Sequence, residues 1–204
     1  TQTRTKKEKI VASRRCVGTM RGREAGVMGV AALGAAEVEK GQFDEGVRVW
    51  DVALARCVAT MRDHGGRVVC LPVLGDGRLA SGSYDSTVKL WDVASARCMA
   101  TLRGHDGAVR SLAVLRDGCL ASASSDHTLK VWDVTSAVCL GTLQNARGRR
   151  SSCLAARRDG RLGCGTRDHK VEVWRVVEGL FASVEELYGH EGAVNCLAML
   201  GDAR

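Results

Sequence analysis

The chain alternates short apolar segments with polar turns, and the same pattern returns at a nearly constant interval of about 40 residues. Four tryptophans mark the period, because Trp50, Trp91, Trp132 and Trp174 are almost evenly spaced along the chain. Each tryptophan ends a run rich in valine or leucine: VRVWDV, VKLWDV, LKVWDV and VEVWRV. Self-similarity at such a period indicates one supersecondary unit that is copied several times. A chain of near-identical units is better suited to presenting a surface than to building one catalytic pocket.

The unit from Ala94 to Val134 shows the pattern most clearly. Its short apolar segments predict four strands, at residues 97–102, 109–115, 119–124 and 128–134. Gly, Asp and Ser residues separate them: a loop at 104–107, a tight turn at Asp117-Gly118 and a second turn at 125–127. Four consecutive strands joined in this way predict an antiparallel meander. A single four-stranded sheet leaves two apolar faces exposed, so neighbouring sheets must cover them, and stacking around an axis gives a propeller.

A Gly-His pair, a Leu-Ala-Ser stretch, an Asp and a closing Trp-Asp recur at this spacing, and together they resemble the WD-repeat β-propeller family. The resemblance extends from about Arg15 to the end of the chain. It implies an all-β propeller in which each sequence repeat supplies the outer strand of one blade and the three inner strands of the next.

The units differ in quality. Two keep the full residue set: Asp63-His64, Ser81, Asp85 and Trp91 in one, Gly104-His105, Ser122, Asp126 and Trp132 in the next. The unit ending at Trp50 keeps Asp44 but has Arg23 at the His position and Lys40 at the Ser position. The unit ending at Trp174 keeps Asp168, lacks the Gly-His pair and has Cys164 at the Ser position. A fifth unit opens with Gly189-His190 and stops at Gly201-Asp202.

This count predicts four full blades and a partial fifth. An outer strand is expected near Cys16, and an inner strand of the fifth blade at Val194–Leu200. We therefore expect a truncated or incompletely closed ring, with an irregular small ring as the alternative. Residues 1–14 are expected to form a flexible basic segment and residues 15–204 the propeller. Pro72 falls inside a predicted innermost strand, where a sheet edge tolerates the missing N–H.

The repeated His, Ser and Asp could be mistaken for a catalytic triad. A triad needs one strained nucleophile beside one oxyanion hole, and nothing favours two tandem copies. The resemblance instead implies a buried hydrogen-bonded network in each blade, complete around Trp91 and Trp132. The incomplete copies contain Asp44, Trp50, Asp168, Trp174 and His190.

We predict no catalytic residue, because no phosphate-loop, dinucleotide, zinc-protease or nucleophile-elbow motif occurs. We predict no cofactor either. Asp126-His127 and Asp168-His169 are turn residues on separate blades, so no metal site is predicted.

Nine cysteines occur without a CxxC pair, and Cys16, Cys57, Cys98 and Cys139 recur with the period of the repeat. Repeat position explains them as small buried residues of a reducing compartment, so the cytoplasm or the nucleus is expected. No apolar run approaches the roughly 20 residues of a membrane span. The net charge is +7, and part of it lies in an arginine cluster between residues 147 and 161. Such a cluster attracts nucleic acid or acidic partners, but no aromatic residues are interleaved as a stacking platform needs.

The resemblance points to a partner-binding face that carries the Gly-His loops. Outward positions before the network Asp are Phe43, Tyr84, Ser125 and Arg167, and positions near the start of the innermost strands are Arg67, Arg110 and Asn195. Their arginines would favour an acidic or phosphorylated peptide. We therefore predict a non-enzymatic scaffold that binds other proteins or peptides as a subunit or adaptor of a complex. Two alternatives stay open: a nucleic-acid-associated propeller, and a regulatory propeller fragment of a larger enzyme or of a ubiquitin-ligase substrate receptor.

Overall fold

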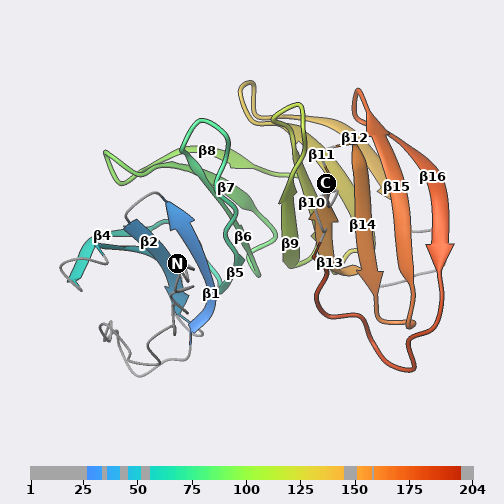
Figure 1. The fold of residues 1–204 in the computed structure, drawn as a ribbon. Coiled ribbons are helices and arrows are strands. Elements are labelled where there is room, and N and C mark those ends of the chain that lie inside the picture. Colours follow the sequence, from blue (N-terminus) through green and yellow to red (C-terminus); the bar gives the residue numbers. More distant parts are fainter. Residues whose placement is uncertain are drawn as a thin grey trace, which may run out of the picture.

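The described part of the chain forms sixteen strands in four antiparallel sheets of four strands each. The computed structural model describes residues 27–33, 36–41, 46–51, 56–144, 151–157 and 159–198. The sheets follow one another along the chain, and we call them blades 1 to 4. Figure 1 shows them arranged side by side around an arc. No helix in these ranges is long and apolar enough to cross a membrane.

Each blade is a simple up-and-down meander. Blade 1 consists of β1 (Val27–Leu33), β2 (Ala36–Gly41), β3 (Gly46–Asp51) and β4 (Arg56–Arg62). Blade 2 consists of β5 (Val68–Cys70), β6 (Leu79–Ser83), β7 (Val88–Asp92) and β8 (Arg97–Leu102). Blade 3 consists of β9 (Val109–Val114), β10 (Leu120–Ser124), β11 (Thr128–Asp133) and β12 (Val138–Gln144). Blade 4 consists of β13 (Ser151–Ala156), β14 (Arg161–Thr166), β15 (Val171–Val177) and β16 (Leu180–Leu187).

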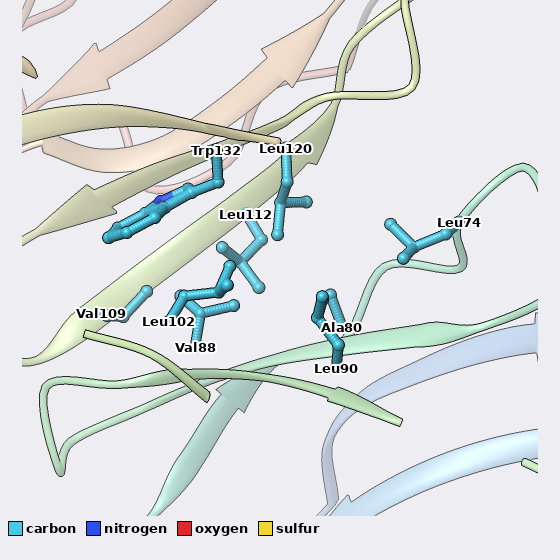
Figure 2. Close-up of a cluster of buried hydrophobic side chains, with 9 residues drawn as sticks. All are labelled: Leu74, Ala80, Val88, Leu90, Leu102, Val109, Leu112, Leu120 and Trp132. Carbon is cyan, nitrogen blue, oxygen red and sulfur yellow. The ribbon is translucent and has the colours of Figure 1, made fainter. Parts of the chain in front are cut away.

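The apolar core lies between consecutive blades. Figure 2 shows the interface of blades 2 and 3, where residues such as Val88 and Leu102 face Leu120 and Trp132. The same arrangement recurs between blades 1 and 2, where Trp91 joins Val47 and Met61. Each of these closing tryptophans therefore packs against the blade before it. Burial of such large side chains contributes roughly 1.5–3 kcal/mol apiece and holds the stack together.

The all-β class, the meander and the four full blades are those predicted from the sequence, and the blades form a partial, unclosed propeller. The predicted inner strand at Val194–Leu200 is wrong over the residues that the structure describes. Residues 193–198 belong to no strand, although the Val194 N–H donates to the Thr166 carbonyl at 3.0 Å. A strand needs a ladder of such bonds, and here no described neighbouring strand continues the pairing.

Pro72 also corrects the sequence analysis. β5 ends at Cys70, and Pro72 lies beyond it, next to an isolated bridge between Val73 and Leu79. The corresponding residue of blade 3 is Ala113, which lies inside the longer strand β9. Proline has no N–H to donate to the ladder, so it shortens the innermost strand of blade 2. The strand predicted near Cys16 and the segment 1–14 lie outside the described residues, and these two predictions stay untested.

The periodic cysteines are a third correction. They were expected to be buried, but Cys57 and Cys139 are exposed and Cys98 is only partly buried. All three lie on the outer strands β4, β8 and β12, which have a neighbouring strand on one side only within their sheet. The repeat thus fixes the position of these residues in the blade, and the blade edge leaves them accessible.

Candidate partner-binding site

A chain of buried hydrogen bonds crosses blade 2. The Trp91 indole N–H donates to Ser81 Oγ at 2.7 Å, and Ser81 Oγ lies 2.6 Å from His64 Nε2. His64 Nδ1 lies 2.7 Å from Asp85 Oδ2. A carboxylate only accepts, so the proton sits on Nδ1, and Nε2 accepts from the serine hydroxyl. Every polar atom of the chain then has a partner, as burial requires.

Blade 3 repeats the chain of bonds with Trp132, Ser122, His105 and Asp126, at distances of 2.8, 2.7 and 2.8 Å. A threonine that the sequence analysis missed completes both copies. Thr87 Oγ1 donates to Asp85 Oδ1 at 2.7 Å, and Thr128 Oγ1 donates to Asp126 Oδ1 at 2.8 Å. Its signal in the sequence is a threonine two residues after the aspartate in both units.

The network sets the charge of its members. Burial lowers the pKa of His64 and His105, although a carboxylate beside each ring opposes the shift. Burial alone would raise the pKa of Asp126, but hydrogen bonds from Thr128 and His105 lower it to about 2. The histidines are therefore neutral and the aspartates ionised near neutral pH. Each buried polar atom of the network is satisfied in one arrangement, and a network of this kind fixes strand register.

The closing tryptophans of the flanking blades differ from these two within the part of the chain that the structure describes. Trp50 and Trp174 have buried indole N–H groups with no hydrogen-bond acceptor among the described residues. Asp168 is exposed, and so is His190 of the fifth unit. Asp44 lies outside the described residues. The structure thus joins the predicted network residues in blades 2 and 3, and it leaves the indole of Trp174 in blade 4 outside any comparable network.

Four of the predicted partner-binding residues line one cavity of about 260 Å³. Tyr84 and Arg167 come from turns of blades 2 and 4, Arg110 from the innermost strand β9 of blade 3, and Asn195 from the segment after β16. Val69 of β5 and Ser152 of β13 complete the lining. The lining contains two arginines and no acidic residue, so the site is electropositive.

Two guanidinium groups lie close to the ring of Tyr84. The carbon atoms Cζ of Arg67 and Arg110 are each 5.5 Å from the centre of its ring. Stacking of cations on the ring holds the arginines in place without neutralising them. The Arg110 Nε–H is buried and has no acceptor in the described part of the chain. This donor is available to an acceptor that a partner supplies, because an unmet buried donor costs about 1–3 kcal/mol.

Val69 and Ser152 line the cavity but are not among the residues predicted from the sequence, and the strand register explains why. β5 and β9 begin at Val68 and Val109, so the residue of blade 2 that corresponds to Arg110 is Val69. Ser152 occupies the same place in blade 4. The predicted equivalence of Arg67 and Arg110 is therefore wrong: Arg67 lies two positions before Val69, and it contacts Tyr84 of the site. Ser125 bonds inward to the Ala108 carbonyl at 3.1 Å, and Phe43 lies outside the described residues.

The comparisons with known proteins agree with this architecture. The family model of the WD domain, G-beta repeat, matches residues 55–92 and 96–133. These two stretches are WD repeats. In both matched stretches the repeat begins with the outer strand of one blade, at β4 and β8, and ends in the third strand of the next.

Solved structures show the same fold. A chain from "Structure of U3-55K" aligns with a TM-score of 0.78 and 26% sequence identity. The alignment covers 87% of this chain and 56% of that chain, so the protein spans little more than half the length of this structural neighbour. No match is found among the curated proteins. WD40 propellers usually bind other proteins, so the fold suggests a protein-interaction scaffold and names no complex.

Proposed function

We propose that this protein is an adaptor that docks an acidic or phosphorylated peptide in the cavity lined by Tyr84, Arg110 and Arg167. The observation that carries the proposal is the convergence of side chains from three blades and the fifth unit on one electropositive hollow. A short peptide fits a volume of about 260 Å³ by one or two side chains. Tyrosine and arginine are the residue types on which binding energy concentrates at interfaces.

The chemistry of the lining favours an anionic side chain over an apolar one. Arginine offers a planar fork of N–H donors that matches a carboxylate or a phosphate. Arg110 is already oriented by Tyr84, and its Nη1 approaches the tyrosine hydroxyl within 3.5 Å. Preorganised donors of this kind lose little side-chain entropy when an anion binds. Ser152 and Asn195 add neutral hydrogen-bonding groups at the rim.

The nucleic-acid alternative has weaker support. Arg157 and Arg161 of the basic cluster both lie beside Asp159, with Nε to Oδ2 distances of 3.4 and 3.5 Å. Their charge is therefore partly offset within the protein, and the sequence places no aromatic platform within the cluster.

We also propose that the protein resides in the cytoplasm or the nucleus. The described cysteines form no disulfides, which agrees with a reducing compartment.

Fluorescence anisotropy with two labelled probes tests the proposal: a ten-residue polyglutamate peptide and a peptide with one phosphoserine in a Gly-Ser background. We expect Arg110→Ala and Arg167→Ala each to weaken binding of the better probe about tenfold or more, the loss typical of a charge-assisted hydrogen bond. Arg97→Ala is the matched control. Arg97 is exposed on the outer strand β8, so this substitution removes the same charge away from the cavity.

Equal losses from Arg97→Ala and Arg110→Ala would reduce the binding to net charge and contradict the site. A labelled ten-residue RNA that binds more tightly than both peptides, with affinity falling steeply as salt is added, would favour the nucleic-acid alternative instead.

A further inference from the structure

A second and larger cavity lies between blades 3 and 4. Its volume is about 420 Å³. Its lining comes from the β9–β10 turn, the β13–β14 turn and the β15–β16 hairpin: Leu115, Arg116, Asp117, Asp159, Gly160, Val176, Val177 and Glu178. These connections lie at the strand ends opposite to the turns that carry Tyr84 and Arg167, because the sheets are antiparallel. The second cavity therefore opens on the other face of the propeller.

The neighbouring junction shows what fills the corresponding space. Between blades 2 and 3, the guanidinium of Arg78 donates from Nε to Asp76 Oδ2 at 2.7 Å. Its Nη1 donates across the junction to the Val134 carbonyl of blade 3 at 3.4 Å. The same two acceptors recur one repeat later, as Asp117 and Val176, and both line the second cavity.

The residue that should supply the guanidinium is missing from the second junction. Arg78 precedes Leu79, which pairs with Trp91, and Cys119 precedes Leu120, which pairs with Trp132, so Cys119 occupies the arginine's position in blade 3. A cysteine side chain carries no guanidinium that could donate to a carbonyl of the next blade. Burial, helped by the charges of Asp117 and Asp133, raises the pKa of its thiol to about 11, so it offers no charge in place of the arginine. At this junction the position that corresponds to Arg78 therefore supplies no guanidinium to Asp117 and the Val176 carbonyl.

A longer hairpin then walls the cavity in. Trp132 pairs with Cys139, seven residues on, whereas Trp174 pairs with Ser183, nine residues on. The extra residues extend the β15–β16 hairpin, and its tip leans on strand β12. A Cβ atom on Gly141 of that strand would overlap the Gly179 carbonyl at the tip. The wall is thus held against blade 3 by close backbone contact.

The charges of the lining suit a cation. Asp117 uses Oδ1 to accept from the Cys119 N–H at 3.0 Å, which leaves the side chain placed as Asp76 is in the other junction. Glu178 replaces Ser136 and adds a carboxylate. Asp159 lies beside Arg157 and Arg161, and Arg116 is exposed at the rim, where it offsets one negative charge. Asp117 and Glu178 remain as the carboxylates that face an incoming cation.

We propose that this cavity binds an arginine side chain of a partner protein. The guanidinium would lie between Asp117 and the Val176 carbonyl, as that of Arg78 lies between Asp76 and the Val134 carbonyl. Its methylene groups would pack on Leu115 and Val177. Arginine is favoured over lysine because the two acceptors stand apart and require a forked planar donor. The inference does not depend on the electropositive site of the other face.

Nuclear magnetic resonance titration of the whole chain tests this site, with acetyl-Ala-Arg-Ala-amide as the probe. Control peptides carry lysine or norleucine in place of arginine. Cys119→Arg should fill the cavity from within and weaken binding of the arginine probe at least tenfold, while raising the melting temperature. Cys119→Ser leaves the cavity empty and should bind like the wild type. Glu178→Gln, a change in an exposed turn, should weaken binding about threefold, as for a partly screened ion pair.

Loss of binding in Cys119→Arg, with Cys119→Ser unchanged, supports the proposal. Equal affinity for the lysine or the norleucine peptide would overturn it, and so would a Cys119→Arg variant that is folded and binds as before. If Cys119→Arg does not fold, the Glu178→Gln titration decides: unchanged affinity there refutes the site.

Discussion

Blades 3 and 4 share one topology and a bulge before the closing tryptophan, but the burial and the hydrogen bonding of that tryptophan differ between them. Trp132 is 1% exposed, and its indole N–H donates to Ser122. Trp174 is only partly buried, and its indole N–H finds no acceptor among the described residues. Cys164 stands in the place of Ser122, and burial raises the pKa of its thiol to about 12. The two blades thus form a natural pair, one with the polar network and one without it.

The comparison of blades 3 and 4 indicates that the alternation of apolar residues is enough to specify the four strands of a blade. The polar network is not required for that. Blade 4 forms four strands and buries Leu162 and Val173 without any histidine in those strands. The network in blades 2 and 3 then supplies stability and a unique register, because each buried polar atom is satisfied in one arrangement only. Four predictions break or sharpen this comparison, from the largest expected effect to the smallest.

Truncation of the two tryptophans should separate the blades most clearly. Trp132→Ala removes a buried indole from the interface of Figure 2, and Ser122 loses the hydrogen bond that it accepts from this indole. We therefore expect a loss of about 3–5 kcal/mol in the free energy of unfolding. Trp174→Ala should cost clearly less, because that indole is partly exposed and makes no such bond. Urea denaturation followed by circular dichroism measures both. A cost for Trp174→Ala as large as that for Trp132→Ala would contradict the comparison.

The hairpin that leans on blade 3 can be displaced by one methyl group. Gly141→Ala places a Cβ against the Gly179 carbonyl, and the backbone must move to make room. We expect a loss of about 1–3 kcal/mol, the usual cost of overpacking. Gly75→Ala is the matched control, since nothing lies within 4 Å of its added Cβ. Similar melting temperatures for the two variants would show that the tip does not rest on β12.

An exchange of the serine and the cysteine between the blades should act in opposite directions. Ser122→Cys weakens the acceptor of the Trp132 indole and should destabilise the protein by about 1 kcal/mol, whereas Cys164→Ser offers Trp174 an acceptor and should stabilise it by a smaller amount. Thermal denaturation of both variants at equal concentration measures the changes. The same sign in both would mean that the local packing, not the indole bond, decides.

Acidification should act on blades 2 and 3 through their histidines. The pKa of His64 and His105 is lower in the folded protein, so their contribution to stability is complete above the ordinary value of about 6.5 and is lost as the pH falls below it. Asp126, with its pKa lowered to about 2, loses its contribution only below about pH 4. Melting temperatures between pH 8 and 5 measure the first effect. The double variant His64→Gln, His105→Gln should flatten this slope, and an unchanged slope would assign it to other groups.

The sequence predicts the repeated parts of the molecule better than the parts where one repeat meets the next. Periodic apolar positions place the four strands β8 to β11 within about one residue, because each strand is specified locally. The early end of β5 before Pro72 and the strandless segment at Val194 depend on ladder partners, which a strand pattern alone does not describe.

The sites follow the same rule. The family resemblance predicts the face that carries Tyr84 and Arg167. Prediction of Val69 and Ser152 as lining residues requires the exact register of strands β5 and β13. The second cavity cannot be predicted from a single repeat, because its lining comes from two neighbouring blades.

The repeat places a cysteine at the same position on the outer strand of each of the first three blades. Cys57, Cys98 and Cys139 occupy matching positions on the outer strands β4, β8 and β12, each opposite a closing tryptophan. Cys57 and Cys139 are exposed, and they stand two blades apart. With Cys16, Cys98 and Cys196 replaced by serine, spin labels can be attached to Cys57 and Cys139. The distance between the labels reports the angle from blade to blade, and that angle fixes how many blades a complete ring built on this geometry would hold.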